Sequence, residues 1–342
     1  MKSLKRSLTL LAAGSALFAL DPLSAAESGG KPYKIVNTAQ LMGAGGIDYV
    51  FADSDGRRLY VPRGNQVLVF DLETLKPSGS ITNARARGVA VDPKSHHGFC
   101  SSSPVVMWDT KTLETIKTIE VQGRPDGIIF EPLTERIYVL SHSQPNVTAI
   151  NSKDGTVAGT IDLGGAPEQA ASDGKGHMYI DLEDKDNIAV VDAASMKVTA
   201  HYDLSGKGGT CAGLALDVKN NILFAACRNP QNMVILSAAD GKIITTLPIG
   251  QGTDGAAFNP ATMEAFSSQG DGTLTIVKEK GPKDFVVEQT VKTMPRAKTM
   301  TLDTKTNRVL LIAAQYGPAP AGGRGGPMLP DSFSILVVGK SE

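Results

Sequence analysis

The sequence predicts an all-β fold built from seven copies of a four-stranded antiparallel unit, because two landmarks recur in register. The first landmark closes the first strand of each unit and returns every 39 to 44 residues, at Asp53, Asp92, Glu131, Asp173, Asp217, Asn259 and Asp303. The second lies near the end of each third strand, at Asp71, Asp109, Asn151, Asp192, Ser237, Lys278 and Val338. A period of about 40 to 45 residues with four strands per copy is typical of a β-propeller blade. We therefore expect a seven-bladed β-propeller.

The first unit shows the pattern most clearly. Residues 58–71, RLYVPRGNQVLVFD, predict a strand, a loop carrying Arg63 and Gly64, and a second strand that ends on an aspartate. β-Branched and aromatic residues bounded by turn residues favour such pairing. Residues 45–53 supply an earlier strand and residues 78–83 a later one. Together they make one four-stranded blade.

The last unit is one strand short. It contains strands at residues 298–303, 307–314 and 332–338, and the chain then reaches its last residue. Residues 33–42 precede the first unit and have no partners there. We expect this segment to become the outer strand of blade seven, which closes the ring and leaves no long sheet edge open.

The first 26 residues have the pattern of a secretory signal peptide. Lys2, Lys5 and Arg6 precede an apolar run, and small residues at 24–26 suit cleavage after Ala26. The apolar run is too short to cross a bilayer, and we expect no later stretch to span one. We therefore expect export to a periplasmic or secreted location, with residues 27–342 forming a single propeller domain.

The composition indicates which classes of binding partner are favoured. The chain is 41% hydrophobic and carries a net charge of −1, which is typical of a soluble globular protein and does not favour bulk electrostatic binding of nucleic acid. Only 5% of residues are aromatic, which gives few stacking platforms for single strands. We expect a monomer that does not bind nucleic acid.

Three cysteines are present: Cys100, Cys211 and Cys227. If Asp217 and Ile222 flank a tight hairpin, the antiparallel register places Ala212 opposite Cys227 and leaves Cys211 one step away. A disulfide between Cys211 and Cys227 stays an open alternative, because an exported chain permits it. The diagonal geometry favours buried free thiols instead.

A candidate site follows from the register. Five residues before each first landmark, at the mouth of the central channel, stand Asp48, Arg87, Asp126, Glu168, Ala212, Asp254 and Lys298. Six of these seven side chains are ionisable, where a blade core would favour apolar ones. The sequence therefore predicts a charged, ligand-binding channel mouth.

Two interpretations of this charged ring remain open. In one, Arg87 and Lys298 pair with neighbouring carboxylates, and the ring is a structural ion-pair network. In the other, Asp48, Asp126, Glu168 and Asp254 converge on calcium, which prefers oxygen ligands, or on a polar ligand. No other cofactor is indicated.

Further polar residues are expected on the same face. Its second set comprises Arg63, His142, Asp184, Arg228 and Arg324. Basic groups there would suit a small anionic ligand or an acidic partner protein. The proline- and glycine-rich stretch Gln315–Ser332 should form a long loop above this face, either functional or disordered.

Recognisable catalytic motifs are missing. The five histidines show no zinc spacing, and there is no haem-attachment motif and no phosphate loop. Residues 209–213, GTCAG, match a nucleophile elbow but precede a strand, without the helix such an elbow needs. The sequence therefore favours a binding protein over an enzyme.

Three segments carry a family resemblance: LYVPRGNQVLVFD, IYVLSHSQPNVTAIN and MYIDLEDKDNIAVVD. They resemble the YVTN repeat, and with the signal peptide the chain resembles the exported, YncE-like propellers of bacteria. The resemblance implies a non-catalytic binding or scaffold role for the charged face. Related propellers include calcium-dependent lactonases, in which the metal is a Lewis acid and a carboxylate the base. A lactonase-like hydrolase is therefore the alternative.

Overall fold

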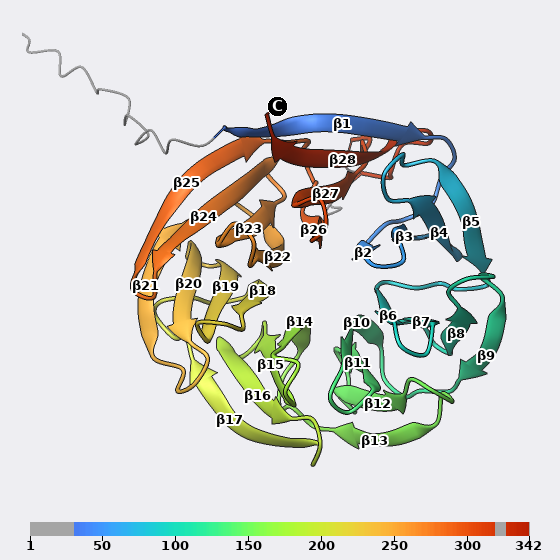
Figure 1. Cartoon of the computed structure of the whole chain (residues 1–342), viewed down its shortest axis with the longest axis horizontal. Helices are drawn as coiled ribbons and strands as arrows, with labels where there is room; N and C mark the ends of the chain where they lie inside the picture. Colours follow the sequence, from blue (N-terminus) through green and yellow to red (C-terminus); the bar gives the residue numbers. More distant parts are fainter. Residues whose placement is uncertain (1–30, 319–325, 342) are drawn as a thin grey trace, which may run out of the picture.

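The computed structural model describes residues 31–318 and 326–341. Their 28 strands form seven four-stranded antiparallel sheets, which stand as blades around a central axis (Figure 1). This confirms the predicted seven-bladed propeller. The expected signal peptide lies outside the described residues. Within the described part of the chain, no helix has the length and apolar character needed to cross a membrane.

Each of the first three blades runs from an inner to an outer strand in chain order. Blade one contains β2 (Phe51–Asp53), β3 (Arg58–Arg63), β4 (Gln66–Asp71) and β5 (Pro77–Thr82). Blade two contains β6 (Val89–Asp92), β7 (His97–Cys100), β8 (Val105–Asp109) and β9 (Thr115–Ile119). Blade three contains β10 (Pro125–Glu131), β11 (Arg136–Ser141), β12 (Val147–Asn151) and β13 (Val157–Ile161).

The remaining blades follow the same plan, except that blade seven takes its outer strand from the start of the chain. Blade four contains β14 (Pro167–Ser172), β15 (His177–Leu182), β16 (Asn187–Asp192) and β17 (Lys197–Asp203). Blade five contains β18 (Cys211–Asp217), β19 (Ile222–Arg228), β20 (Gln231–Ser237) and β21 (Ile243–Pro248). Blade six contains β22 (Thr253–Asn259), β23 (Glu264–Gln269), β24 (Thr273–Gly281) and β25 (Asp284–Lys292). Blade seven contains β26 (Thr299–Asp303), β27 (Arg308–Ala313), β28 (Phe333–Lys340) and β1 (Tyr33–Leu41).

The repeating landmarks are turn residues. The Asp53 carboxylate accepts a hydrogen bond from the backbone N–H of Gly56 at 2.8 Å, and Asp92 accepts one from Lys94 at 2.9 Å. Asp71, a second-landmark residue, does the same for the N–H of Thr74 at 2.7 Å. Short acidic side chains stabilise turns in this way. The repeat visible in the sequence is thus largely the chemistry of the hairpins that end each strand.

The first strand of blade one is shorter than expected. The segment 45–53 forms a strand only over Phe51–Asp53, and Ile47 makes an isolated bridge to Arg63. The backbone before it takes φ values of +94° at Gly43 and +130° at Gly45. Such conformations suit glycine and interrupt an extended strand. The chain therefore bends on its way from blade seven into blade one.

The ring closes through its two ends. β1 pairs antiparallel with β28, from Tyr33 opposite Lys340 to Leu41 opposite Phe333. Figure 1 shows the two strands side by side at the rim of the ring. The closure expected for residues 33–42 is confirmed, one residue shorter at its end.

A polar contact fastens this closing strand to blade six as well. The hydroxyl of Tyr33 donates to the fully buried carboxylate of Glu264, whose other oxygen lies 2.9 Å from Nζ of Lys340. The Gln289 side chain bonds both the backbone N–H and the carbonyl of Tyr33, each at 2.8 Å. Burial, together with Glu264, raises the pKa of Tyr33. The N-terminal strand therefore contacts two blades.

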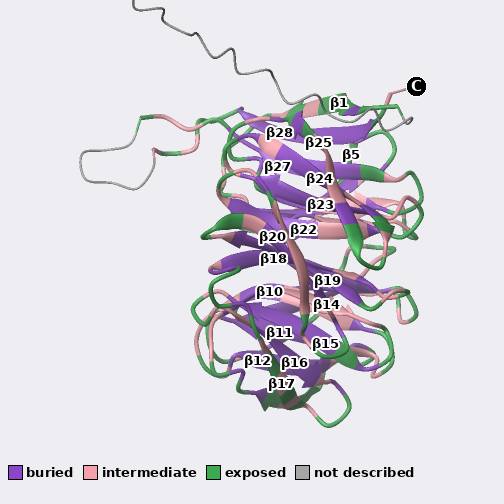
Figure 2. Cartoon of the chain, turned by 90° about the vertical axis from the view of Figure 1, so that its left-hand side faces the viewer, coloured by how far each residue is buried: buried purple, intermediate pink, exposed green. Residues whose placement is uncertain are grey.

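The apolar core lies between neighbouring blades. Figure 2, which views the ring from its edge, shows buried strands in purple stacked from top to bottom across the ring. Between blades one and two, the rings of Tyr60 and Trp108 lie 5.8 Å apart, and both side chains are fully buried. A β-carbon on Gly98 would lie 2.2 Å from the indole, so only glycine fits beneath it. Each blade therefore depends on the next for burial of its faces.

The structure corrects the expectation for two cysteines. A β-bulge between Cys211 and Gly213 shifts the ladder, so that Cys211 stands directly opposite Cys227, and the two form a disulfide with an S–S distance of 2.06 Å. Counting from the hairpin placed Cys211 one step off because it assumed an uninterrupted ladder. The free-thiol interpretation is wrong for this pair. Cys100 is a buried free thiol.

Replacing Tyr33 with Phe should lower the free energy of unfolding by about 2 kcal/mol, because the buried Glu264 carboxylate loses a hydrogen-bond donor. Urea unfolding followed by fluorescence measures this change. Tyr202→Phe is the matched control, since it removes only a neutral hydrogen bond to the carbonyl of Ala238. A loss at Tyr33 no larger than that at Tyr202 would contradict the role given to the closing contact.

Thiol titration under denaturing conditions should find one free thiol per chain before reduction and three afterwards. The double variant Cys211→Ala/Cys227→Ala should lose about 3 kcal/mol of stability, as expected for a bridge that closes a loop of about 15 residues. The control is Cys100→Ala, which leaves the bridge in place. Three free thiols before reduction would exclude the disulfide.

Candidate functional site

The predicted channel-mouth residues meet at one end of the ring. Asp126 lies in β10, Glu168 in β14 and Asp254 in β22. Asp48 and Arg87 lie in the loops that lead into β2 and β6, and Lys298 immediately precedes β26. Because every inner strand starts at the same end of the channel, side chains about 40 residues apart in sequence become neighbours. We call this set, with His142, Glu183 and Arg228, the channel mouth.

Arg87 joins the first three blades. Its NH1 lies 2.7 Å from Oδ2 of Asp48, and its Nε lies 3.2 Å from Oδ1 of Asp126. Asp126 is 5% exposed, whereas the Arg87 side chain is 52% exposed. A half-exposed guanidinium therefore covers a buried carboxylate.

Arg228 joins blades four, five and six. The sequence placed Arg228 in the second set, but it fills the gap that Ala212 leaves in the charged ring. Its guanidinium pairs with Asp254, lies 3.2 Å from Oε2 of Glu183 and 3.9 Å from Oε1 of Glu168. Its Nε also donates to the carbonyl of Thr253 at 2.9 Å. Lys298 pairs with the other oxygen of Asp254.

His142 stands between the two ends of this network. It follows β11, in the loop to β12, and its Nε2 lies 3.1 Å from Oδ2 of Asp126 and 3.9 Å from Oε2 of Glu168. From blade one, across the channel, the Tyr49 hydroxyl donates to Oε2 of Glu168 at 3.0 Å. One atom each from Asp126, His142 and Glu168 lie within 4.8 Å of one another.

The electrostatics follow from burial and crowding. Burial, then the charges of Asp254 and Glu183, raise the pKa of Glu168 to about 8. Asp126 raises the pKa of the His142 imidazole. Burial and the nearby Asp126 carboxylate also raise the pKa of Asp48, against the opposing effect of Arg87. The mouth is thus an acidic cluster held together by three permanent cations.

These contacts bear on both interpretations of the ring. Arg87 and Lys298 pair with neighbouring carboxylates, which is the arrangement of an ion-pair network. The four carboxylates proposed for calcium are instead paired with cations, Asp48 with Arg87 and Asp254 with Arg228 and Lys298. Among the described residues, the group of three that could hold a metal ion is Asp126, His142 and Glu168.

The rest of the second set has varied surroundings. Arg63 is only 5% exposed, and its guanidinium donates to the carbonyls of Met42 and Gly43 at 3.0 and 2.6 Å while lying over the Phe333 ring. Arg63 therefore stabilises the bend that leads from β1 to β2, and its guanidinium is used in these structural contacts. Asp184 is exposed and caps the N–H of Ala166 at 2.7 Å. Arg324 lies outside the described residues.

Two cavities adjoin the mouth. The central channel, with a volume of about 260 Å³, is lined mainly by apolar inner-strand residues together with Glu168 and Gln169. A second cavity, of about 240 Å³, lies beside the mouth at blades one and seven, and is lined by Ile47, Asp48, Arg296, Lys298, Thr299, Ile312 and Tyr316. The Arg296 guanidinium lies 4.0 Å from the centre of the Tyr316 ring. We call this second cavity the mouth pocket.

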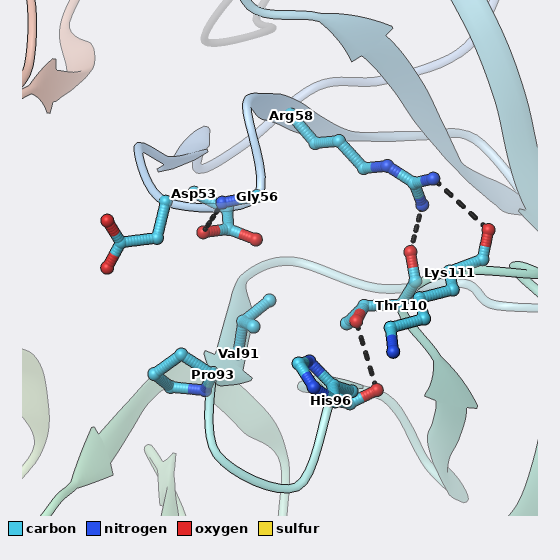
Figure 3. A pocket seen from close by; sticks show the side chains of 9 residues that line it. Asp53, Gly56, Arg58, Val91, Pro93, His96, Thr110 and Lys111 are labelled. Atoms are coloured by element: carbon cyan, nitrogen blue, oxygen red, sulfur yellow. Dashed lines mark hydrogen bonds between the residues drawn. The ribbon is translucent and has the colours of Figure 1, made fainter.

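A larger cavity, of about 330 Å³, lies at the opposite end of the ring, between the turns of blades one and two (Figure 3). Its Arg58 donates to the carbonyl of Thr110 and, at 3.1 Å, to that of Lys111. The Thr110 hydroxyl donates to the carbonyl of His96 at 3.0 Å. These groups tie two blades together, so we favour the channel mouth as the functional site.

Comparison with known proteins places the chain among propellers. No protein-family model matches it. YncE of Escherichia coli O157:H7 is 28% identical over 149 residues, which cover 40% of this chain and 41% of that protein. The seven-bladed fold and this partial match together make the chain similar to YncE. The chain is a YncE-like β-propeller.

Solved structures agree with this YncE-like fold. A chain of the mitotic checkpoint complex is 11% identical, with a TM-score of 0.74 and 99% coverage of both chains. The WD40 repeats of RRP9 are 11% identical, with a TM-score of 0.70, and cover 92% of this chain and 99% of that one. Identities this low show a shared fold alone.

Gln169 is a residue whose role in this YncE-like propeller the sequence did not reveal. Its Oε1 accepts hydrogen bonds from the N–H groups of Leu214 and Ala256, both at 3.0 Å, so that it joins blade four to blades five and six below the mouth. Four other blades have glycine at this position. At Gly213, for example, a β-carbon would lie 2.8 Å from the backbone of Gly255. In the sequence, the signal for this role was a glutamine at a repeat position that is glycine in four other blades.

Arg228→Gln should lower the free energy of unfolding by about 2–3 kcal/mol at pH 8, because Asp254, Glu183 and Glu168 lose their shared cation. The loss should be smaller at pH 5. The pKa of Glu168 lies above its unfolded value, so this group already costs stability as pH rises from about 4.5 to 8, and losing Arg228 increases that cost. Urea unfolding at both pH values measures the difference.

The control for this prediction is Arg124→Gln, which changes an exposed arginine at the start of blade three and should alter stability little at either pH. Equal losses at pH 5 and pH 8 in Arg228→Gln would show that lost packing, and not charge, explains the effect.

Proposed function

We propose that this YncE-like propeller is an exported, non-catalytic binding protein that holds a small anionic ligand at its channel mouth. The mouth pocket carries this proposal, because it combines a cavity of about 240 Å³ with Arg296, Lys298 and an aromatic ring. The signal-peptide pattern of residues 1–26 supports a periplasmic or secreted location.

The charges of the pocket favour an anion. Arg296 is exposed, and among the described residues no carboxylate lies within ion-pair distance of it. Its stacking on Tyr316 orients the planar guanidinium, whose N–H groups match two oxygens of a carboxylate or phosphate. The Lys298 side chain is 48% exposed and adds a second positive charge. Asp48 on the same wall suits a ligand that also carries a hydrogen-bond donor.

Binding is favoured over hydrolysis by the state of the carboxylates. A calcium-dependent lactonase of the expected kind would need Asp48, Asp126, Glu168 and Asp254 to meet at one ion. Asp48 is held by Arg87, and Asp254 by Arg228 and Lys298. Both oxygens of Asp254 are occupied, so at least one of its ion pairs would have to break before the four could share a metal, which is costly for partly buried groups.

Thermal unfolding in the presence of EDTA tests the binding proposal. We expect at least one of citrate, acetate and inorganic phosphate to raise the unfolding midpoint, because a ligand of the folded state stabilises it. Arg296→Gln should weaken that ligand about tenfold, equivalent to about 1.4 kcal/mol. Arg124→Gln is the control, since it removes an exposed arginine from the same face.

An anion that stabilises Arg296→Gln as strongly as the wild type would contradict the pocket, and so would no stabilisation by any anion. Lactones should not be hydrolysed with or without calcium. Calcium-dependent turnover that is lost in Glu168→Gln would instead support the hydrolase.

A further inference from the structure

We propose that Asp126, His142 and Glu168 form a binding site for one divalent transition-metal ion, of the zinc or manganese kind. The inference deepens the proposed function and rests on it, because the ion would lie in the same channel mouth as the anion-binding pocket. It differs from the calcium expectation in its ligands: one imidazole nitrogen and two carboxylates replace four carboxylates.

The three ligand atoms already lie close to one another. Nε2 of His142 is 3.1 Å from Oδ2 of Asp126 and 3.9 Å from Oε2 of Glu168, and all three residues offer a ligand atom within 4.8 Å. Bonds of about 2.0–2.2 Å to a tetrahedral ion place its ligand atoms roughly 3.3–3.5 Å apart. The Asp126–His142 pair is near that spacing, whereas Oε2 of Glu168 is 3.9 Å from Nε2 of His142 and within 4.8 Å of the Asp126 ligand atom, so Glu168 must move closer to both.

Two buried polar atoms at this point are imperfectly paired. Oδ1 of Asp126 and Nε2 of His142 are inaccessible to solvent and make no hydrogen bond of good geometry among the described residues, although Nε of Arg87 lies 3.2 Å from Oδ1 and Oδ2 of Asp126 lies 3.1 Å from Nε2. Asp126 is itself only 5% exposed. Buried polar groups are nearly always satisfied, and an ion explains an exception. A neutral imidazole nitrogen and a carboxylate oxygen that lie 3.1 Å apart can both bind a cation placed between them.

The surrounding charges also favour a cation. The channel mouth holds five carboxylates, Asp48, Asp126, Glu168, Glu183 and Asp254, against three permanent cations, Arg87, Arg228 and Lys298. The carboxylates outnumber the permanent cations, and a divalent ion would add positive charge to this acidic cluster. Buried charges require such compensation.

The neighbours can also orient the ligands. Arg87 lies 3.2 Å from Oδ1 of Asp126, and Arg228 lies 3.9 Å from Oε1 of Glu168, while the other oxygen of each carboxylate faces His142. The Tyr49 hydroxyl donates to Oε2 of Glu168 at 3.0 Å. Partners of this kind fix ligand orientation and raise metal affinity.

The donor set decides the class of ion. Calcium and magnesium prefer oxygen ligands, whereas an imidazole with carboxylates suits zinc, manganese, iron, cobalt or nickel. Three protein ligands leave at least one coordination position free. An oxygen of a ligand bound at the channel mouth can fill that position, which would link the metal site to anion binding.

Isothermal titration of the EDTA-treated and dialysed protein with ZnCl₂, MnCl₂ and CaCl₂ tests the site, with Co²⁺ absorption as a second readout. We expect one Zn²⁺ or Mn²⁺ per chain and weaker binding of Ca²⁺. His142→Ala should weaken Zn²⁺ binding at least about 100-fold, because loss of an outer partner of a ligand already costs about 10–100-fold and loss of a ligand itself should cost more. His201→Ala, an exposed histidine on the outer strand of blade four, is the matched control and should bind as the wild type does.

Asp126→Asn is the second variant, because it keeps the size of the side chain while removing its charge. Urea unfolding of each variant checks that the propeller is folded. Absence of Zn²⁺ and Mn²⁺ binding by the wild type, unchanged binding in folded His142→Ala, or tighter binding of Ca²⁺ would each overturn the metal site. The anion experiment contains EDTA, so a failed metal site with retained, Arg296-dependent anion binding leaves the proposed function standing.

Discussion

The pairing of β1 with β28 is the interaction on which the rest of the structure depends. Six blades are formed by consecutive strands, but the seventh contains strands from both ends of the chain. Closure brings blade one against blade seven and so completes the last inter-blade core. It also completes the channel mouth, because Asp48 and Lys298 become neighbours only in a closed ring. Both the stability of the fold and the candidate site therefore require the ring to be closed by β1 and β28.

The channel mouth shows how a charged cluster can serve structure and binding together. Arg87 and Arg228 each join carboxylates from different blades, so they help to hold the inner ends of the blades in register. Their pairing leaves Arg296 exposed and leaves Asp126, His142 and Glu168 facing one another. We assign binding to Arg296 and to the carboxylate oxygens of Asp126 and Glu168 that face His142.

Much of this architecture could be predicted because the residues that repeat along the sequence are those that stabilise the turns. Asp53, Asp92 and Asp71 bond backbone N–H groups in their hairpins, so their spacing marks the strands and locates the inner residues. Register alone did not reveal side-chain direction. Arg63 turns inward onto carbonyls, whereas Arg228 reaches the ring from the end of a second strand. The bulge before Gly213, which aligns the disulfide, also leaves no trace in the spacing.

The order of pairing in the closing strands has a mechanical consequence. The first residue of β1, Tyr33, stands opposite the last residue of β28, Lys340, so both chain ends leave the sheet at the same place. Tension between the termini would therefore load the hydrogen bonds one after another, as in a zipper, and would not shear them together. The Tyr33–Glu264–Lys340 contact sits where such a force first acts. Resistance of the ring to being pulled open by its ends is thus concentrated in a few side chains.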